Sequence, residues 1–207
     1  MNLKDRWALL VEATHFDWTW RMIETLYGEP HRAYHNLRHI EACFRVFEQL
    51  RRSEDFRESE KAVDLAIFFH DIVYVPGDKR NEEISAGLLQ IVRNIGTCSQ
   101  SDVQHASVAI LATKSHETVA DNIVSQIMID VDLSVLGGTG GEYALFVSRV
   151  RQEYAQVSNE AWRLGRATFL TKMLERKVIF QTPWAINTYE ENARQNMKLE
   201  LMELIRP

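Results

Sequence analysis

The sequence predicts an all-α protein. Apolar residues recur at helical spacing in every long segment, and clusters containing Gly, Pro, Ser, Thr or Asn separate those segments. The one run with a two-residue period, Ile127–Leu133, is short and lies inside a helical pattern, so no strand is expected. The chain shows no internal repeat, and its 207 residues fit a single domain with a substantial core.

Three helices are expected before the first charged connector. The first two cover Leu3–Ala13 and Trp18–Tyr27, and Gly28 ends the second. The third opens at 34–39 and is amphipathic. Its apolar stripe consists of Leu37, Ile40, Phe44, Phe47 and Leu50. The segment Ser53–Glu60 is the charged connector that follows it.

The next helix is apolar on most faces and ends in two polar residues. Ala62–Phe69 is typical of a buried helix, and His70 and Asp71 follow it directly. An imidazole and a carboxylate are costly to bury unpaired, and both are natural ligands of a divalent ion. Adjacent residues on a regular helix point about 100° apart, but a metal ion beyond the helix end could contact both. The alternative is a histidine favoured by the helix dipole beside a solvated aspartate.

Three further helices are expected up to residue 133. A turn at 75–78 leads to a helix with Asn81 as its N-cap and Gly96 at its end. Its expected buried stripe is Ile84, Leu88, Ile91, Val92 and Ile95. The following two helices are Ser101–Thr113 and Asp121–Ile129, the latter running into the sequence DVDL.

The last part of the chain begins with a glycine cluster at 137–141. No strand precedes this cluster and it lacks the order of a P-loop, so we expect a flexible turn between helices. Helices are expected over Tyr143–Val157 and Glu160–Arg176. Thr182 then has the character of an N-cap, with Pro183 at the first position of a helix that runs to about residue 205.

Composition excludes several classes of partner. The net charge of −5 and the sequence pI near 5.8 argue against a protein that holds nucleic acid by bulk charge. No apolar stretch has the length of a membrane span, and Asp5 and Glu12 interrupt anything that resembles a signal sequence. Cys43 and Cys98 form no CxxC pair, and Cys43 lies on the apolar side of a helix. We therefore expect a buried structural thiol and a cytoplasmic protein with no membrane partner.

Four polar residues at helix ends or on inner faces follow one another in a recognisable order. A histidine, His39, precedes the pair His70–Asp71 by about thirty residues, and Asp132 follows about sixty residues later. Each has an ordinary structural explanation when taken singly. The order resembles the H…HD…D signature of the HD-domain superfamily, in particular its predicted metal-dependent phosphohydrolases. The flanking stretches that share this resemblance span nearly the whole chain: YHNLRHI (34–40), FFHDIVY (68–74), NEEISA (81–86), IDVDLSVLG (129–137), VRQEYAQVSNEAWRLGRATFL (150–170) and ENARQNMKLEL (191–201).

The resemblance implies an HD-type helical bundle with a core over about 18–140, completed by C-terminal helices over 141–207. It implies that the metal ligands are His39, His70, Asp71 and Asp132, with His35 as the alternative to His39 and Asp130 as the alternative to Asp132. Two neutral imidazoles and two carboxylates suit Mn²⁺, Fe²⁺, Co²⁺ or Ni²⁺, and Mg²⁺ stays open, as does the choice of one ion or two. Four ligands leave about two positions of an octahedral ion for a water and a phosphoryl oxygen.

The resemblance and, separately, the charge pattern indicate residues that could act on the substrate. Many HD hydrolases have an acidic residue close to the HD pair, and here Glu82 or Glu83 must fill that role. Lys114 and His116 in the sequence TKSH could contact a phosphate, with a solvated surface lysine as the alternative. Tyr34 joins them as a candidate substrate contact. Arg151 and Arg166 lie in the basic segment 149–177 and could clamp phosphate oxygens, although such charge is usually the wet face of a helix.

These residues predict an enzyme that hydrolyses a nucleotide or another small phosphate ester or anhydride. A water activated by the metal attacks phosphorus beside Asp71, and Glu82 or Glu83 relays protons. A di-iron oxygenase is the alternative, with His116 and either His105 or His35 as extra ligands. A metal- or nucleotide-binding sensor without turnover is a third class. The partner is a small phosphorylated molecule in each phosphate-binding case, and a homo-oligomer is left open.

Overall fold

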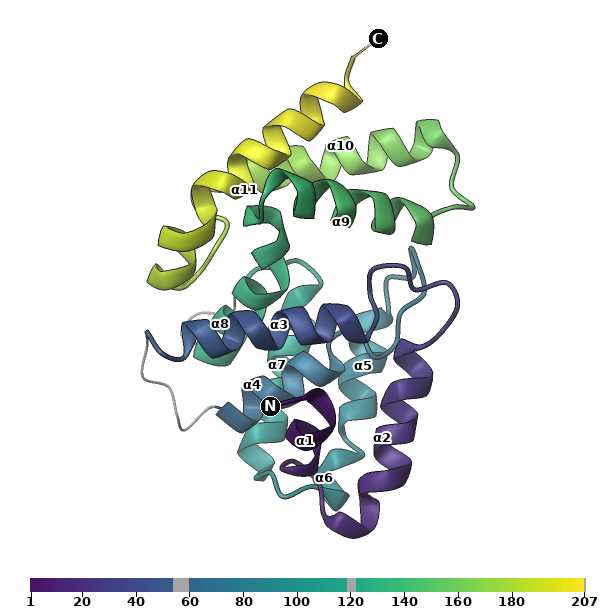
Figure 1. The fold of residues 1–207 in the computed structure, drawn as a ribbon, viewed down its shortest axis with the longest axis vertical. Coiled ribbons are helices and arrows are strands. Elements are labelled where there is room, and N and C mark those ends of the chain that lie inside the picture. The colour runs from purple at the N-terminus through teal and green to yellow at the C-terminus, as the bar shows by residue number, and fades with distance from the viewer. Residues whose placement is uncertain (54–59, 119–121, 207) are drawn as a thin grey trace. The chain divides into compact units, whose positions relative to one another are not determined.

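The computed structural model describes residues 1–53, 60–118 and 122–206, and it confirms the all-α class. Over those residues the chain is built from helices, and the one β feature is an isolated bridge between Val11 and Gly96. The chain divides into two compact units, Met1–Asp132 and Leu133–Pro207 (Figure 1). Folding as one domain stays a prediction.

The first unit is arranged around one apolar helix. Its helices are α1 (Leu3–Ala8), α2 (Ala13–Tyr27), α3 (Leu37–Leu50), α4 (Glu60–Phe69), α5 (Asn81–Leu89), α6 (Val92–Ile95), α7 (Gln100–Thr113) and α8 (Ile123–Leu133). Figure 1 shows α1, α3, α5 and α7 gathered around α4, and α4 packs directly against α3, α5 and α7. Every residue from Ala62 to Phe69 is buried, as expected.

Aromatic rings fix α4 to its neighbours. Phe68 contacts the rings of Trp7 in α1 and Phe44 in α3, with centroids 5.2 and 4.9 Å apart. The hydroxyl of Tyr27, at the end of α2, donates a hydrogen bond of 2.9 Å to the carbonyl of Phe68. Three helices that are distant in sequence therefore hold the C-terminal turn of α4 in place.

The two N-terminal helices differ in length from the prediction. The first ends at Ala8 rather than at Ala13, and the second begins at Ala13 rather than at Trp18. The reason is a long-range backbone contact: Thr97 donates to the carbonyl of Leu10 at 2.9 Å, and Glu12 donates to the carbonyl of Ile95 at 3.1 Å. These bonds hold Val11 and Glu12 outside the helices, which helical spacing alone does not reveal.

The prediction for the helix after the turn was wrong in three respects. Arg80, not Asn81, is the N-cap, and the expected single helix divides into α5 and α6 at 90–91. The buried face carries Asn81, Ser85, Ala86 and Leu89, whereas Ile84 is 45% exposed. The buried face differs because of two hydrogen bonds made by the Asn81 side chain. Its oxygen accepts from the backbone N–H of Val75 and its NH₂ group donates to the carbonyl of Val75, each at 3.0 Å, and these bonds orient the helix.

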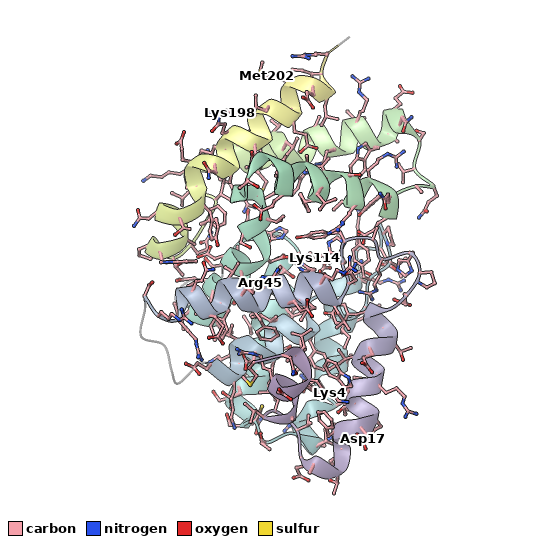
Figure 2. The ribbon with its side chains drawn as sticks, in the orientation of Figure 1. Lys4, Asp17, Arg45, Lys114, Lys198 and Met202 are labelled. Carbon is pink, nitrogen blue, oxygen red and sulfur yellow. The ribbon has the colours of Figure 1, made fainter. Side chains whose placement is uncertain are left out.

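Helix α7 begins close to its predicted position. Ser99 and Asp102 form a capping box, so α7 starts at Gln100, one residue before the predicted Ser101. The predicted start of the next helix at Asp121 and most of the predicted connector lie outside the described residues. Side chains of this unit are drawn in Figure 2, where Arg45 marks the exposed side of the amphipathic α3.

The second unit consists of the short 3₁₀ helix η2 (Ser134–Gly137) and the helices α9 (Gly140–Glu153), α10 (Asn159–Glu175) and α11 (Pro183–Leu204). Lys198 and Met202 mark the outer side of α11 in Figure 2. Thr182 is the N-cap of α11, with Pro183 at its first position, as predicted. Within the described residues no single helix is long and apolar enough to cross a membrane, and only a bent helix pair, Ile123–Gly137 with Gly140–Glu153, meets that test by length and composition.

The glycine cluster is more ordered than the predicted flexible turn. Gly137 ends η2, and Gly140 and Gly141 form the first turn of α9, behind a capping box made by Thr139 and Glu142. A Cβ at Gly137 would come within 2.6 Å of the Cβ of Tyr189 in α11. This glycine therefore permits η2 to pack closely against α11.

Candidate metal centre

The first donor comes from the N-terminal turn of α3. Asn36 is the N-cap: its side-chain oxygen accepts from the backbone N–H of Arg38 at 3.0 Å, and its amide donates to the carbonyl of Arg32 at 3.2 Å. This cap begins the helix at Leu37 and turns the third helical residue, His39, into the interior, where its side chain is 2% exposed.

Two donors come from the end of α4. The helix ends at Phe69, although the backbone N–H of His70 still bonds the carbonyl of Ala66 at 2.9 Å. The chain then turns, and the adjacent side chains of His70 and Asp71 converge, with Nε2 and Oδ2 3.1 Å apart. The loosened backbone after a helix end thus brings together side chains that a regular helix would separate.

The fourth donor, Asp132, completes the group from near the end of α8. One donor atom from each of His39, His70, Asp71 and Asp132 lies within 4.8 Å of the others. The two Nε2 atoms are 3.0 Å apart, and Asp132 Oδ1 is 3.3 Å from His39 Nε2 and 3.7 Å from His70 Nε2. The distance from His39 Nε2 to Asp71 Oδ2 is 3.7 Å.

The spacings of 3.0, 3.1 and 3.3 Å fit donors that share one ion, and the two spacings of 3.7 Å are slightly wider. An ion about 2.1 Å from two donors holds them about 3.0 Å apart at a right angle and about 3.4 Å apart at the tetrahedral angle. The donor chemistry fits as well: His70 Nδ1 is 3.0 Å from the carbonyl of Ile67 and donates to it, so in a neutral ring Nε2 is the acceptor that points into the group. The two imidazoles are almost fully buried, whereas the side chains of Asp71 and Asp132 are 18% and 17% exposed.

The electrostatics of the group separate its two imidazoles. Burial lowers the pKa of His39 below its ordinary value. Burial has the same tendency at His70, but the neighbouring Asp71 and Asp132 carboxylates outweigh it and raise the pKa of His70. Despite their burial, the pKa values of Asp71 and Asp132 are lowered by the surrounding histidines. Both carboxylates are therefore ionised and able to act as ligands at neutral pH.

Three more predicted residues lie around the donor group. His116 Nε2 is 3.2 Å from the second carboxylate oxygen of Asp132, and His35 Nε2 is 4.0 Å from Asp71 Oδ2. The ring of Tyr34 has its centroid 4.9 Å from that of His39. His35 is thus a neighbour of the group rather than a member, and it is His39 that lies within it. His116 has a positive φ of 51°, a conformation that non-glycine residues seldom adopt.

The two candidate proton relays have different surroundings. Glu83 forms an ion pair with Lys114, and this contact lowers the pKa of Glu83. Lys114 also donates to the carbonyl of Lys79 at 2.6 Å. Glu82 is half-buried: burial and the Asp71 charge raise its pKa above the ordinary value. Lys114, labelled in Figure 2, is exposed, and its ammonium joins the end of α7 to the start of α5.

The predicted arginine clamp lies in the second unit, where both arginines have partners of that unit. Arg166 is buried and forms two hydrogen bonds with Glu200 in α11, at 2.8 and 2.9 Å. Arg151 bonds the carbonyls of Tyr154 and Val157 at 2.6 and 3.0 Å, across the turn between α9 and α10. His105, on α7, is exposed.

Sequence reasoning missed the residue that joins the two histidine-bearing segments. Arg32 is buried, and its guanidinium donates to the carbonyls of Asp71 at 2.6 Å, Ile72 at 2.9 Å and His35 at 3.1 Å. It therefore ties the segment before α3 to the backbone that carries Asp71. An arginine two residues after Pro30 gives no local signal of contacts with residues about forty positions away.

Comparisons with known proteins add no relatives. No protein-family model matches the chain, and neither the curated proteins nor the solved structures yield a match.

Proposed function

We propose that the chain is a metal-dependent phosphohydrolase of the HD-domain type that acts on a nucleotide or another small phosphate ester or anhydride. The observation that carries this proposal is the convergence of two imidazole nitrogens and two carboxylate oxygens at metal-ligand spacing. A mixed set of this kind suits Mn²⁺, Fe²⁺, Co²⁺ or Ni²⁺. Both cysteines are free, in keeping with the proposed cytoplasmic location.

The residues of the first unit have distinct proposed roles. His39, His70, Asp71 and Asp132 would hold the ion, which when bound supplies an activated water and a Lewis-acid contact for a phosphoryl oxygen. His116 holds Asp132 through its second oxygen and orients that carboxylate. Tyr34 and His35 line the same part of the unit and are the proposed substrate contacts there.

Glu82 is the proposed proton relay in preference to Glu83. Burial raises the pKa of Glu82 above its ordinary value, and a carboxyl group with a raised pKa is the better suited of the two to accept a proton. Glu83 is already neutralised by Lys114 on the surface.

The test is a pair of matched variants, Glu82→Gln and Glu83→Gln, assayed with nucleoside mono-, di- and triphosphates and an aryl phosphate in the presence of Mn²⁺ or Co²⁺. Glu82→Gln should lower kcat by about 10²–10⁴-fold with the metal content unchanged, because only the proton acceptor is removed. Glu83→Gln should retain near-wild-type turnover. Equal activity of the two variants would contradict the assignment of Glu82, and the absence of phosphatase activity on every substrate would contradict the proposed reaction.

A di-iron oxygenase is the second candidate, favoured by the histidines that flank the two carboxylates. His116 beside Asp132 and His35 beside Asp71 could serve as ligands of a second ion. Metal analysis of protein purified without added metal distinguishes the candidates: two irons per chain would favour the oxygenase, and one ion the hydrolase.

A further inference from the structure

The second unit holds a pocket between the end of α9 and α10, which a short turn joins (Figure 1). Its volume is about 400 Å³, within the range of about 300–1,000 Å³ typical of small-molecule sites. Most of its walls are apolar or aromatic, formed by Val150, Val157, Ala161, Tyr154, Trp162 and Phe169. All lining residues belong to the second unit, so the pocket shares no residue with the candidate metal centre.

One buried side chain that lines this pocket has an unused hydrogen-bond donor. Arg166 is 8% exposed, and its Nε and Nη2 donate to the two carboxylate oxygens of Glu200 at 2.8 and 2.9 Å. The other terminal nitrogen, Nη1, makes no hydrogen bond to the described residues. It is not among the fully enclosed polar atoms that lack a partner, so it remains accessible. A buried guanidinium with a free N–H edge at a pocket is suited to bind an acceptor atom of a ligand.

Gly165 keeps additional space open in the same pocket. It lies in the interior of α10, where glycine is less favourable to the helix than alanine. No close neighbour requires a glycine here, because a Cβ would meet no atom within 4 Å. Gly137 differs, since a Cβ there would collide with Tyr189. The missing side chain of Gly165 therefore enlarges the pocket and is not needed for helix packing.

The chemistry of the walls indicates the class of ligand. Flat rings stack on aromatic side chains, and Tyr154, Trp162 and Phe169 are each only partly buried. Glu200 already neutralises the Arg166 guanidinium, so the pocket offers a hydrogen-bond donor without a net charge. We propose that the pocket binds an uncharged, flat heteroaromatic ring, with a hydrogen bond from Arg166 Nη1 to a ring carbonyl oxygen. A nucleobase that carries a carbonyl group has this chemistry.

The expected consequence is selection between bases by one atom. Arg166 would bind a carbonyl oxygen, and a base with an amino group at that position would be rejected because two donors would face each other. Inosine and adenosine are matched probes, since their purine rings present an acceptor oxygen and a donor NH₂ group at the same position. Both lack a phosphate, so neither depends on the proposed metal centre for a phosphate contact.

The experiment is a calorimetric titration of the metal-free full chain with inosine and with adenosine. The wild type should bind one inosine per chain, at least about tenfold more tightly than adenosine, because the amino group cannot accept the hydrogen bond from Arg166. Gly165→Leu should weaken inosine binding by at least about tenfold, since its side chain occupies the pocket. Gly87→Leu is the matched control: Gly87 is also helical and has no atom within 4 Å of its Cβ position, but it lies in α5 of the first unit. It should bind inosine like the wild type.

A second variant isolates the hydrogen bond. Arg166→Met/Glu200→Leu removes the donor and its counter-ion together, and it should bind the two nucleosides with affinities within about threefold of each other. Circular dichroism shows whether each variant is folded, and the Gly165→Leu result stands without the double variant.

Three outcomes would overturn the proposed site. They are the absence of inosine binding to the wild type at millimolar concentration, unchanged binding to folded Gly165→Leu, and equal affinity of the wild type for both nucleosides. His70→Ala should bind inosine like the wild type, whatever its metal content. Loss of inosine binding in that variant would assign the nucleoside to the first unit and would also overturn the pocket.

Discussion

The donor group of the first unit and the Arg166–Glu200 pair of the second unit differ in how their buried charges are balanced. In the second unit each charge has its counter-ion: the guanidinium and the carboxylate form two hydrogen bonds, and both side chains are 8% exposed. In the first unit two imidazoles and two carboxylates converge, and the carboxylates raise the pKa of His70. An ion pair is already neutral and needs no further counter-ion, whereas a group with two carboxylates and two imidazoles favours a bound cation. The surroundings of a charged residue therefore indicate function better than its charge does.

The largest expected effect follows from removing one of the converging bases. His70→Ala or Asp71→Ala should abolish stoichiometric Mn²⁺ or Co²⁺ binding, because each variant deletes one donor beside another. The thermal stabilisation conferred by the ion should disappear with it, since an ion at 100 times its Kd stabilises the folded state by about 2.7 kcal/mol. Metal analysis and melting curves with and without metal measure both effects.

His105→Ala is the control for that experiment, because His105 is an exposed histidine on α7. It should bind metal and melt like the wild type. Full metal content and unchanged metal-dependent stabilisation in both donor variants would show that these residues do not form the centre.

The second expected effect comes from breaking the neutralised pair. Glu200→Ala leaves the Arg166 guanidinium buried without its carboxylate, which should cost about 3–5 kcal/mol of unfolding free energy. Metal binding should not change. Urea denaturation is the measurement, and Glu203→Gln, at an exposed position of the same helix, should stay within about 0.5 kcal/mol of the wild type.

The double variant Arg166→Met/Glu200→Leu tests the reason for that loss. Replacing both charges with apolar side chains of similar volume should recover most of the stability, because no buried charge is left alone. A double variant as unstable as Glu200→Ala would point to packing rather than charge.

A third effect concerns pH and lies inside the first unit. Asp64 of α4 is buried and accepts a hydrogen bond of 2.7 Å from Arg6, which also pairs with Glu48. Burial raises the pKa of Asp64 to about 6, although Arg6 opposes the rise. The folded state thus binds this proton more tightly than the unfolded state does, so the stability from Asp64 is fully present below pH 4 and is lost as pH rises through 6. The loss is about 3 kcal/mol.

Asp64→Asn, which resembles the protonated acid, measures this effect. In the metal-free protein it should match the wild type near pH 4 and become the more stable of the two by pH 7. If the unfolding free energy of the wild type instead rises relative to that of the variant as pH rises, the ion pair with Arg6 dominates and the pKa of Asp64 is lowered.

The smallest expected effect tests the predicted phosphate clamp. Arg151→Lys should lower the unfolding free energy by about 1 kcal/mol, because an ammonium cannot bond the carbonyls of Tyr154 and Val157 and the side chain of Asn159 in the same geometry. KM should stay unchanged. Arg149→Lys on the same helix is the control. A rise in KM confined to Arg151→Lys would support the predicted contact between Arg151 and phosphate.

The parts of the fold that sequence predicted well depend on neighbouring residues. The apolar run of α4, the cap at Thr182 and the helical periods of α9 to α11 are local signals, and they correctly predict that these helices exist. The bounds of α9 differ: it covers Gly140–Glu153 rather than the predicted Tyr143–Val157. The failures depend on distant residues. The extended segment after α1 needs the backbone at 95–97, and the rotation of α5 needs the bonds between Asn81 and Val75 across a loop.

The same distinction applies to the candidate centre. His39, His70, Asp71 and Asp132 were predicted from an ordered pattern, and they do lie together. Their ligand role stays a prediction. Arg32 was not assigned to the centre, because neither its residue type nor its local spacing shows that the guanidinium bonds the Asp71 carbonyl.

The position of Arg32 has a consequence for local opening of the protein. Its three carbonyl contacts join residues 35, 71 and 72, so the segment before α3 cannot detach without leaving buried carbonyls unpaired. The two segments should therefore exchange their amide hydrogens as one cooperative group, slowly and together. The backbone at His35 and Asp71 is in this way held in position, so binding of the proposed ion would need no rearrangement of the backbone there.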